Sequence, residues 1–216
     1  MTGRSGAARQ SPTGLDTVVD RVVRVAQEVV EKPGVVLIGG CSRSGKTWLA
    51  NQICAGVKAA GFSCLVIGLD AWIVSLENRG PDSTVLQRYS CKEIIAAIRK
   101  LLIGYPIYPP TYDPVTRRRI QERTSIPLKA ASGVVLLEGV IALALEELRH
   151  CSWLNIFVTA PDAVRHERLN HFYHQVKGLD DQSTQRVIGS REIEEVNFIR
   201  GTAKWADMIF DGGFVS

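Results

Sequence analysis

The chain has 216 residues, of which 45% are hydrophobic and 22% are charged. This composition is typical of one globular domain with a sizeable core, and it excludes a fibrous or largely disordered protein. The net charge of +4 is too small for the dense Lys and Arg stripes that bind nucleic acid polymers. We therefore expect small anionic ligands as partners and no nucleic acid.

The ends and the cysteines predict where the protein works. Residues 1–14 contain Arg4 and Arg9 but no apolar segment after them, which favours a flexible tail over a signal peptide or membrane anchor. No apolar run reaches the roughly 18 residues that a spanning helix needs, so no membrane partner is expected. The five cysteines lack paired C-x-x-C spacing, which favours free thiols in the cytoplasm. The sequence leaves open whether the chain forms a homo-oligomer.

Apolar patterning predicts alternating helices and strands. Valines at helical spacing predict a helix over 15–32, which Pro33 and Gly34 end. The run "VVLIG" at 35–39 predicts a buried strand, and a helix is expected over 47–61 after a Gly/Ser loop.

Four later runs complete the pattern. Apolar strands are expected at 64–70, 133–139, 153–161 and 206–213, with a helix over 162–176. Apolar strands separated by helices favour parallel pairing through crossovers. The prediction is an α/β fold, a parallel sheet flanked by helices, in a single domain spanning 15–216.

One segment interrupts this alternation. Residues 105–128 carry five of the nine prolines and look β-like around "PIYPPTY" and "RIQERTSI". A long irregular insertion in a compact domain is usually functional or disordered. We interpret it as a β-hairpin that projects over the site, although its run Arg117, Arg118 and Arg119 could also be a plain solvated surface.

The segment "GCSRSGKT" at 40–47 carries the strongest signal. It matches G-x-x-x-x-G-K-[ST] and lies between a predicted buried strand and a helix, where a phosphate loop belongs. The glycines let backbone N–H groups converge on phosphates, Lys46 would reach the β- and γ-phosphates, and Thr47 would offer its hydroxyl to magnesium. The residues expected to contact the nucleotide are Gly40, Cys41, Ser42, Arg43, Ser44, Gly45, Lys46, Thr47 and Trp48.

Two acids follow predicted strands. Asp70 and Glu138 both stand at carboxyl ends of apolar runs, the edge where open α/β sheets bind ligands. A kinase needs such a carboxylate to accept a proton from the attacking hydroxyl, and a metal ion to hold the triphosphate. The alternatives are a helix N-cap for Asp70 and a structural strand-end acid for Glu138.

Six segments together resemble the uridine kinase and phosphoribulokinase group of P-loop kinases. They are "GGCSRSGKT", "IGLDAW", "IYPPTYDPVTRRR", "VVLLEGVIAL", "NIFVTAPDAVRHERL" and "TAKWADMIFDGG", in that family's order. The resemblance implies a five-stranded parallel core that uses ATP and Mg²⁺. It implies that Asp70 is the general base, that Thr47 and Glu138 bind magnesium with Asp70 nearby, and that Tyr112 packs on the acceptor.

The sequence also departs from that family. Arg117 stands where uridine kinases carry a base-reading histidine, and "RGPDSTVLQRYS" does not reproduce their F-D-H-P-like stretch. A guanidinium suits a carboxylate, a phosphate or an acceptor-rich base. We therefore expect Arg117 to contact such a group on the acceptor, with Arg118 or Arg119 pointing to solvent because neighbouring strand residues face opposite sides.

A lid is expected over 170–190. The family's arginine-rich lid becomes "FYHQVKGLDD", in which only Lys177 keeps a basic position, while Phe172 and Leu179 stand at arginine positions. Closing a lid would bring cations against the transferring phosphoryl group. Each candidate lid cation could instead be a plain surface charge. The nearby histidines His166, His171 and His174 are expected to face solvent. The candidate lid cations are Arg165, Arg168, Lys177 and Arg191.

These observations favour an ATP- and Mg²⁺-dependent kinase whose acceptor is a hydroxyl of a small molecule, such as a nucleoside or sugar phosphate. One alternative is a nucleotide-driven switch or assembly ATPase, although the chain has no N-K-x-D or D-x-x-G sequence. The other is a degenerate kinase-like protein that binds nucleotide without turnover. Retention of Lys46, Thr47, Asp70 and Glu138 together argues against it.

Overall fold

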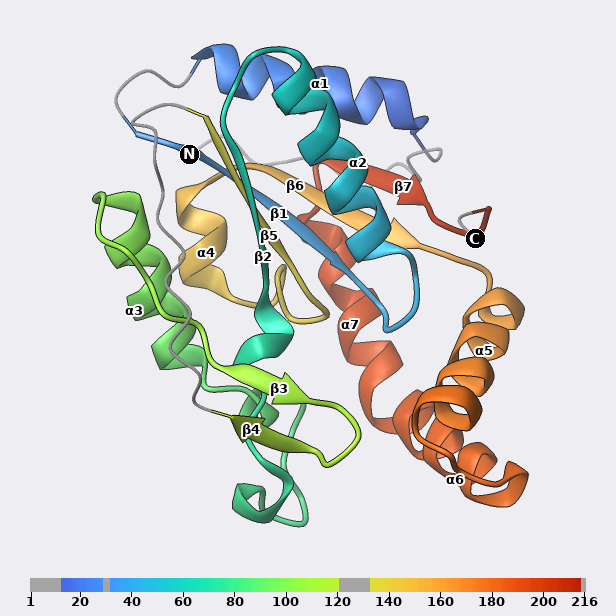
Figure 1. The fold of residues 1–216 in the computed structure, drawn as a ribbon. Coiled ribbons are helices and arrows are strands. Elements are labelled where there is room, and N and C mark those ends of the chain that lie inside the picture. The colour runs from blue at the N-terminus through green and yellow to red at the C-terminus, as the bar shows by residue number, and fades with distance from the viewer. Residues whose placement is uncertain (1–12, 29–31, 121–132, 215–216) are drawn as a thin grey trace.

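The computed structural model describes residues 13–28, 32–120 and 133–214, except for the side chains of Arg191 and Glu194. Most of the expected tail, the end of the first expected helix and the last part of the expected hairpin therefore lie outside the described residues. Figure 1 shows a central sheet with helices on both faces.

The sheet contains all five expected strands. They are β1 (Gly34–Gly40), β2 (Cys64–Gly68), β5 (Val134–Glu138), β6 (Ser152–Thr159) and β7 (Met208–Asp211). All pair in parallel, in the order β2-β5-β1-β6-β7. Strand β1 lies in the middle of this order, and all seven of its residues are therefore buried, as the apolar run predicts. The α/β prediction is confirmed.

Strand alternation divides the core into two layers. Val36 and Ile38 face one layer, in which they pack with α1 (Leu15–Glu28) and α2 (Lys46–Ala59). Val35 and Leu37 face the other layer, which is covered by three helices (Figure 1). These helices are α3 (Cys91–Leu102), α4 (Glu146–Cys151) and α7 (Asn197–Gly201).

A third group of helices lies beside the carboxyl edge of the sheet (Figure 1). Helix α5 (Asp162–His171) continues into a π-helical turn at Phe172–Val176, and α6 (Asp181–Arg191) continues into a second π-helical turn at Glu192–Val196. Asp180 caps α6 by accepting a hydrogen bond from the Ser183 N–H at 2.7 Å. These helices occupy the predicted lid region, and their closing motion stays a prediction.

The predicted hairpin is present but short. Strand β3 (Thr111–Asp113) pairs antiparallel with β4 (Arg118–Ile120), with Tyr112 opposite Arg119. Strand β3 begins only after Pro109 and Pro110, because proline has no N–H to donate to a strand partner. The hairpin also lies near the carboxyl edge of the sheet (Figure 1).

Across the part of the chain that the structure describes, no helix combines the length and the apolar character needed to cross a membrane.

Candidate active site

The phosphate loop is built around two glycines with positive φ. Gly40 ends β1 at φ 145°, and a Cβ there would lie 2.3 Å from the Val158 carbonyl oxygen. Gly45 precedes α2 at φ 100°. Arg43 also has positive φ, at 62°, in a region that non-glycine residues rarely occupy. The loop therefore holds a backbone shape that needs support from its surroundings.

Lys46 lies inside this loop. Its side chain is buried, and Nζ donates a hydrogen bond to the Cys41 carbonyl oxygen at 2.8 Å. An ammonium has three donors, so two remain for phosphate oxygens. The geometry suits the predicted role of Lys46.

Thr47 and Glu138 meet across the sheet edge. Thr47 Oγ1 donates to Glu138 Oε1 at 3.1 Å. Burial raises the pKa of Glu138, a shift that Lys46 opposes and the Asp70 charge reinforces. The hydroxyl and carboxylate oxygens fit Mg²⁺, which usually takes one or two protein oxygens and completes its shell with water and phosphate. Among the described residues no group of three His, Cys, Asp or Glu could hold a metal, and such a site does not need one.

Asp70 lies in the 3-10 turn Leu69–Trp72, directly after β2. Buried Leu69 and Trp72 anchor this turn, while Asp70 itself is exposed and accepts a hydrogen bond from Tyr89 Oη at 3.1 Å. The N-cap alternative is wrong, because Gly68 occupies the cap position and no side chain caps the turn. Tyr89 was not found from the sequence, since nothing in its segment marks it.

The acceptor side centres on Tyr112. Arg79 Nη2 donates to Tyr112 Oη at 3.0 Å, and Arg79 Nε donates to the Val74 carbonyl at 2.8 Å. Arg79 therefore orients the aromatic ring that the resemblance places against the acceptor. Sequence reasoning missed Arg79, because it lies in a segment without periodicity.

Of Arg118 and Arg119, one was expected to point to solvent. Arg118 is exposed as expected, but Arg119 does not point to solvent. Its backbone N–H donates to Ser75 Oγ at 2.8 Å, Nη1 donates to Ser90 Oγ at 3.0 Å, and Nη2 pairs with Glu93. Arg119 pairs with Tyr112 across the hairpin and so shares its inward face.

Arg117 lies in the turn rather than in β4, with φ 58°. Strand alternation therefore does not govern its direction. Its carbonyl oxygen accepts from the Leu76 N–H at 3.0 Å, and its side chain is half-buried. Contact with an acceptor stays a prediction.

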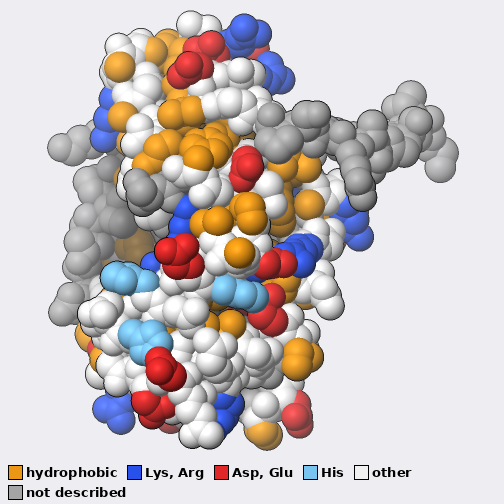
Figure 2. All heavy atoms as spheres, turned by 90° about the vertical axis from the view of Figure 1, so that its right-hand side faces the viewer, with side chains coloured by type: hydrophobic (Ala, Val, Ile, Leu, Met, Phe, Trp, Pro, Cys, Tyr) orange, Lys and Arg blue, Asp and Glu red, His pale blue; other side chains and the backbone are white. Residues whose placement is uncertain are grey.

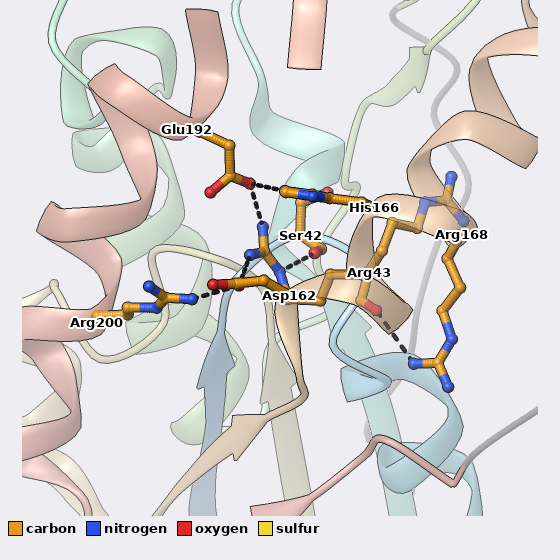
Figure 3. A network of polar contacts seen from close by, with 8 residues as sticks. Ser42, Arg43, Asp162, His166, Arg168, Glu192 and Arg200 are labelled. Carbon is orange, nitrogen blue, oxygen red and sulfur yellow. Dashed lines mark hydrogen bonds and ion pairs between the residues drawn. The ribbon is translucent and has the colours of Figure 1, made fainter. Parts of the chain in front are cut away.

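Two of the four candidate lid cations contact the phosphate loop backbone (Figure 3). Arg165 is buried and donates to the Ser42 carbonyl at 3.2 Å, whereas Arg168 donates to the Arg43 carbonyl at 3.2 Å. Glu192 also binds Arg165, at 3.0 Å. Arg165 is thus not a plain surface charge, and its partner Glu192 was not found from the sequence.

The other two candidates are placed less directly. Lys177 Nζ lies 5.6 Å from the centre of the Phe172 ring and 5.4 Å from that of Tyr173. Arg191 ends α6, and its side chain lies outside the described residues. Neither placement tests a role in phosphoryl transfer.

The histidines were expected to face solvent: His171 is exposed and the His166 side chain is 40% exposed, whereas that of His174 is 30% exposed. His166 Nε2 lies 3.2 Å from Glu192, while His174 contacts the Leu179 carbonyl at 2.8 Å and Asp181 at 3.2 Å. Figure 2 shows histidine side chains gathered with Asp and Glu on the face that carries α5 and α6. Glu192 orients the His166 ring, and Asp181 orients the His174 ring.

Known proteins resemble this chain in sequence and in fold. No family model matches it. It is 25% identical over 196 residues to a uridine kinase of Lactobacillus helveticus, with 85% of this chain and 89% of the relative covered. A uridine kinase of Deinococcus deserti is 28% identical over 190 residues, which cover 84% of this chain and 89% of the relative.

Solved structures agree on the fold. A Bacillus stearothermophilus protein described as a possible uridine kinase has a TM-score of 0.61 at 21% identity, covering 91% of this chain and 99% of its own. A candidate fructose transport system kinase from Silicibacter sp. TM1040 has a TM-score of 0.71 at 18% identity, covering 92% and 98%. This chain therefore has the fold of the P-loop kinases and is similar in sequence to uridine kinases over most of its length.

Proposed function

We propose that this protein is an ATP- and Mg²⁺-dependent kinase that transfers the γ-phosphoryl group to a hydroxyl of a small molecule. The observation that carries the proposal is the meeting of three groups at one edge of the sheet. They are Lys46 inside the phosphate loop, the Thr47–Glu138 pair, and Asp70 on the adjoining turn. The free cysteines among the described residues are compatible with a cytoplasmic setting.

Each residue has a distinct task in this proposal. The loop N–H groups and Lys46 bind the phosphates and oppose the charge that develops on them. Thr47 and Glu138 would hold magnesium, which would neutralise negative charge on the phosphates. Asp70 orients the acceptor hydroxyl and accepts its proton, and Tyr89 fixes the Asp70 carboxylate through one oxygen.

Exposure suits Asp70 for this task. Glu138 is the buried acid whose pKa is raised, whereas Asp70 is open to an incoming acceptor. Two neighbouring carboxylates in different environments can divide metal binding and proton transfer between them. This arrangement supports turnover over a degenerate, binding-only protein.

The acceptor side supports a substrate class. Tyr112 supplies an aromatic wall held by Arg79, and Arg117 adds a fixed positive charge in the neighbouring turn. Such a surface fits a nucleoside, a sugar phosphate or a similar molecule that carries an anionic or acceptor-rich group. The relatives named uridine kinase support this class.

The test is a screen of nucleosides, sugar phosphates and vitamin-like alcohols with ATP and Mg²⁺. Mass spectrometry would follow the gain of one phosphoryl group on each compound. Phosphorylation of one acceptor class, absent in an Asp70→Asn variant, is the expected result. ATP hydrolysis that proceeds equally without any acceptor would instead support the switch or assembly ATPase.

A further inference from the structure

The outer side of the phosphate loop needs hydrogen-bond donors. When the N–H groups of a phosphate loop converge inward on an anion, its carbonyl oxygens turn outward. A polar backbone group in a partly buried place is costly without a partner. Here the carbonyls of Ser42 and Arg43 receive donors from Arg165 and Arg168, which lie three residues apart on one face of α5.

Arg165 commits its guanidinium to this support. It is 2% exposed, and its three nitrogens donate to three different groups. Nε reaches the Ser42 carbonyl at 3.2 Å, Nη1 reaches Asp162 at 2.8 Å, and Nη2 reaches Glu192 at 3.0 Å. These bonds use three of its five N–H donors and orient the guanidinium toward Ser42, Asp162 and Glu192.

A second layer holds these partners. Asp162 also binds Arg200 in α7, and Glu192 also contacts His166, so the network joins α5, α7 and the turn after α6 (Figure 3). The Arg200 hydrogen bond, more than Arg165, holds the pKa of Asp162 below its usual range, and so keeps it ionised. The Asp162 carboxylate is therefore available to orient Arg165 at neutral pH.

Arg168 makes a parallel set of contacts. Nη1 donates to the carbonyls of Arg43, at 3.2 Å, and Gly212, at 3.1 Å, while Nη2 donates to Gly213 at 3.3 Å. The chain after β7 passes so close to the loop that a Cβ on Gly212 would lie 2.0 Å from the Ser44 carbonyl oxygen. Arg168 thus ties the loop to the end of β7.

The loop makes one contact in return. The Arg43 guanidinium carbon lies 3.9 Å from the centre of the Phe172 ring, in the turn after α5. Arg43 also holds a positive φ of 62°, which neighbouring contacts must maintain. Three contacts therefore join residues 42–43 of the loop to α5 and the turn that follows it.

We propose that Arg165 and Arg168 are positioning residues that hold the outward carbonyls of the phosphate loop, so that its N–H groups are preorganised for the phosphates of a nucleotide. This inference rests on the proposed nucleotide-binding function and changes the role of both arginines from lid cations to loop supports. A lid cation that contacts the γ-phosphate acts on turnover. A loop support acts on diphosphate and triphosphate binding alike, because both fill the loop.

The main experiment measures ADP and ATP binding by calorimetry, with no acceptor present. Arg168→Ala is the test variant because Arg168 is only half-buried, and Arg186→Ala, an exposed arginine on α6, is the matched control. We expect Arg168→Ala to weaken both nucleotides by about tenfold, as loss of charge-assisted hydrogen bonds predicts, and the control to stay within about twofold of wild type.

Thermal unfolding without nucleotide separates positioning from general stability. Arg168→Lys keeps the charge, one donor nitrogen and the aliphatic stem, so ADP affinity between those of wild type and Arg168→Ala is expected. A purely structural role would lower the melting temperature and leave the affinity of the folded protein unchanged. That result would overturn the inference.

Glu192→Gln provides a second route that leaves both arginines in place. The amide keeps one acceptor oxygen for Arg165 but loses the charge, and ADP binding about threefold weaker is expected. Unchanged ADP affinity in both Arg168→Ala and Glu192→Gln would overturn the inference, as would a fall in turnover with ADP affinity unchanged.

The same data separate this inference from the proposed function. Wild type that binds ADP but phosphorylates no acceptor would contradict only the kinase proposal. Wild type that binds neither ADP nor ATP would contradict both.

Discussion

The nucleotide side and the acceptor side of this site are built by different means. On the nucleotide side, the binding groups are mainly backbone N–H groups with a buried lysine, and arginines from α5 brace the backbone from behind. On the acceptor side, side chains provide the surface, as in the Arg79–Tyr112 contact. Backbone geometry tolerates few sequences, whereas a side-chain surface changes with one substitution. A single substitution should therefore alter the acceptor surface more easily than the loop backbone.

Lys46→Ala should have the largest effect and would test the nucleotide side. It removes the ammonium that lies within the loop at 2.8 Å from the Cys41 carbonyl, along with the charge expected to face the β- and γ-phosphates. We expect phosphoryl transfer to be lost and nucleotide binding to weaken, as measured by a coupled ADP assay and by calorimetry. Lys58→Ala, at an exposed position on the same helix, is the control. Near-normal transfer by Lys46→Ala would remove the loop from catalysis.

Asp70→Asn should come next and marks the boundary between the two sides. The amide keeps the shape and can still accept a hydrogen bond from Tyr89, but it cannot accept a proton from the acceptor. Turnover should fall by about 10² or more, while ATP affinity stays nearly unchanged. Turnover within about threefold of wild type would show that Asp70 is not the base.

Arg117→Ala compared with Arg118→Ala would sharpen the account of the acceptor side. A charge-assisted pair is worth about 1.5 to 3 kcal/mol, so kcat/KM for the acceptor should fall by roughly tenfold or more for Arg117→Ala alone. Exposed Arg118 is the matched control. ATP affinity should not change in either variant.

Equal, small effects of the two substitutions would return the arginine run to a plain surface. Efficient phosphorylation of plain uridine by wild type would have the same meaning. Arg119 is unsuitable as a control, because its contacts with Ser90 and Glu93 hold the hairpin in place.

The smallest expected effect is a change in melting temperature caused by Glu138→Gln. Loss of the Glu138 carboxylate should also impair magnesium-dependent transfer. Burial raises the folded-state pKa of Glu138 above its ordinary value of 4.5, so ionisation destabilises the folded protein at neutral pH. The amide removes that penalty, and the melting temperature without nucleotide should rise by roughly 2 °C at pH 8.

The pH dependence gives the control for Glu138→Gln. Well below pH 4.5 the carboxyl is protonated in the folded and unfolded states, so the difference from wild type should disappear. Exposed Glu77→Gln should show no such rise. A lower melting temperature for Glu138→Gln at pH 8 would mean that its carboxylate stabilises the fold.

The sequence predicted most of the fold and the nucleotide side because their signals are local. Each of the five apolar runs forms a strand, and the phosphate loop lies between β1 and α2 as its spacing requires. Asp70 and Glu138 were found because the carboxyl ends of parallel strands share one edge.

The parts that the sequence did not predict depend on contacts between distant segments. The sequence left open which of Arg118 and Arg119 faces solvent, because the direction of Arg119 is set by Ser75, Ser90 and Glu93, which lie 26 or more residues away. The contact of Arg165 with the Ser42 carbonyl, 123 residues away, was not predicted, because nothing local in the sequence shows it. Local sequence patterns determine the helices and strands, whereas hydrogen bonds and ion pairs between distant segments determine which way a charged side chain points.

Transfer of labelled γ-phosphate from ATP tests the central claim most directly. Wild type and Asp70→Asn would be incubated with labelled ATP, Mg²⁺ and the best acceptor from the screen, and the label on acceptor and on inorganic phosphate would be counted separately. The account predicts label on the acceptor hydroxyl with wild type, strongly reduced with Asp70→Asn. Label that appears only in inorganic phosphate, at the same rate with or without acceptor, would contradict it.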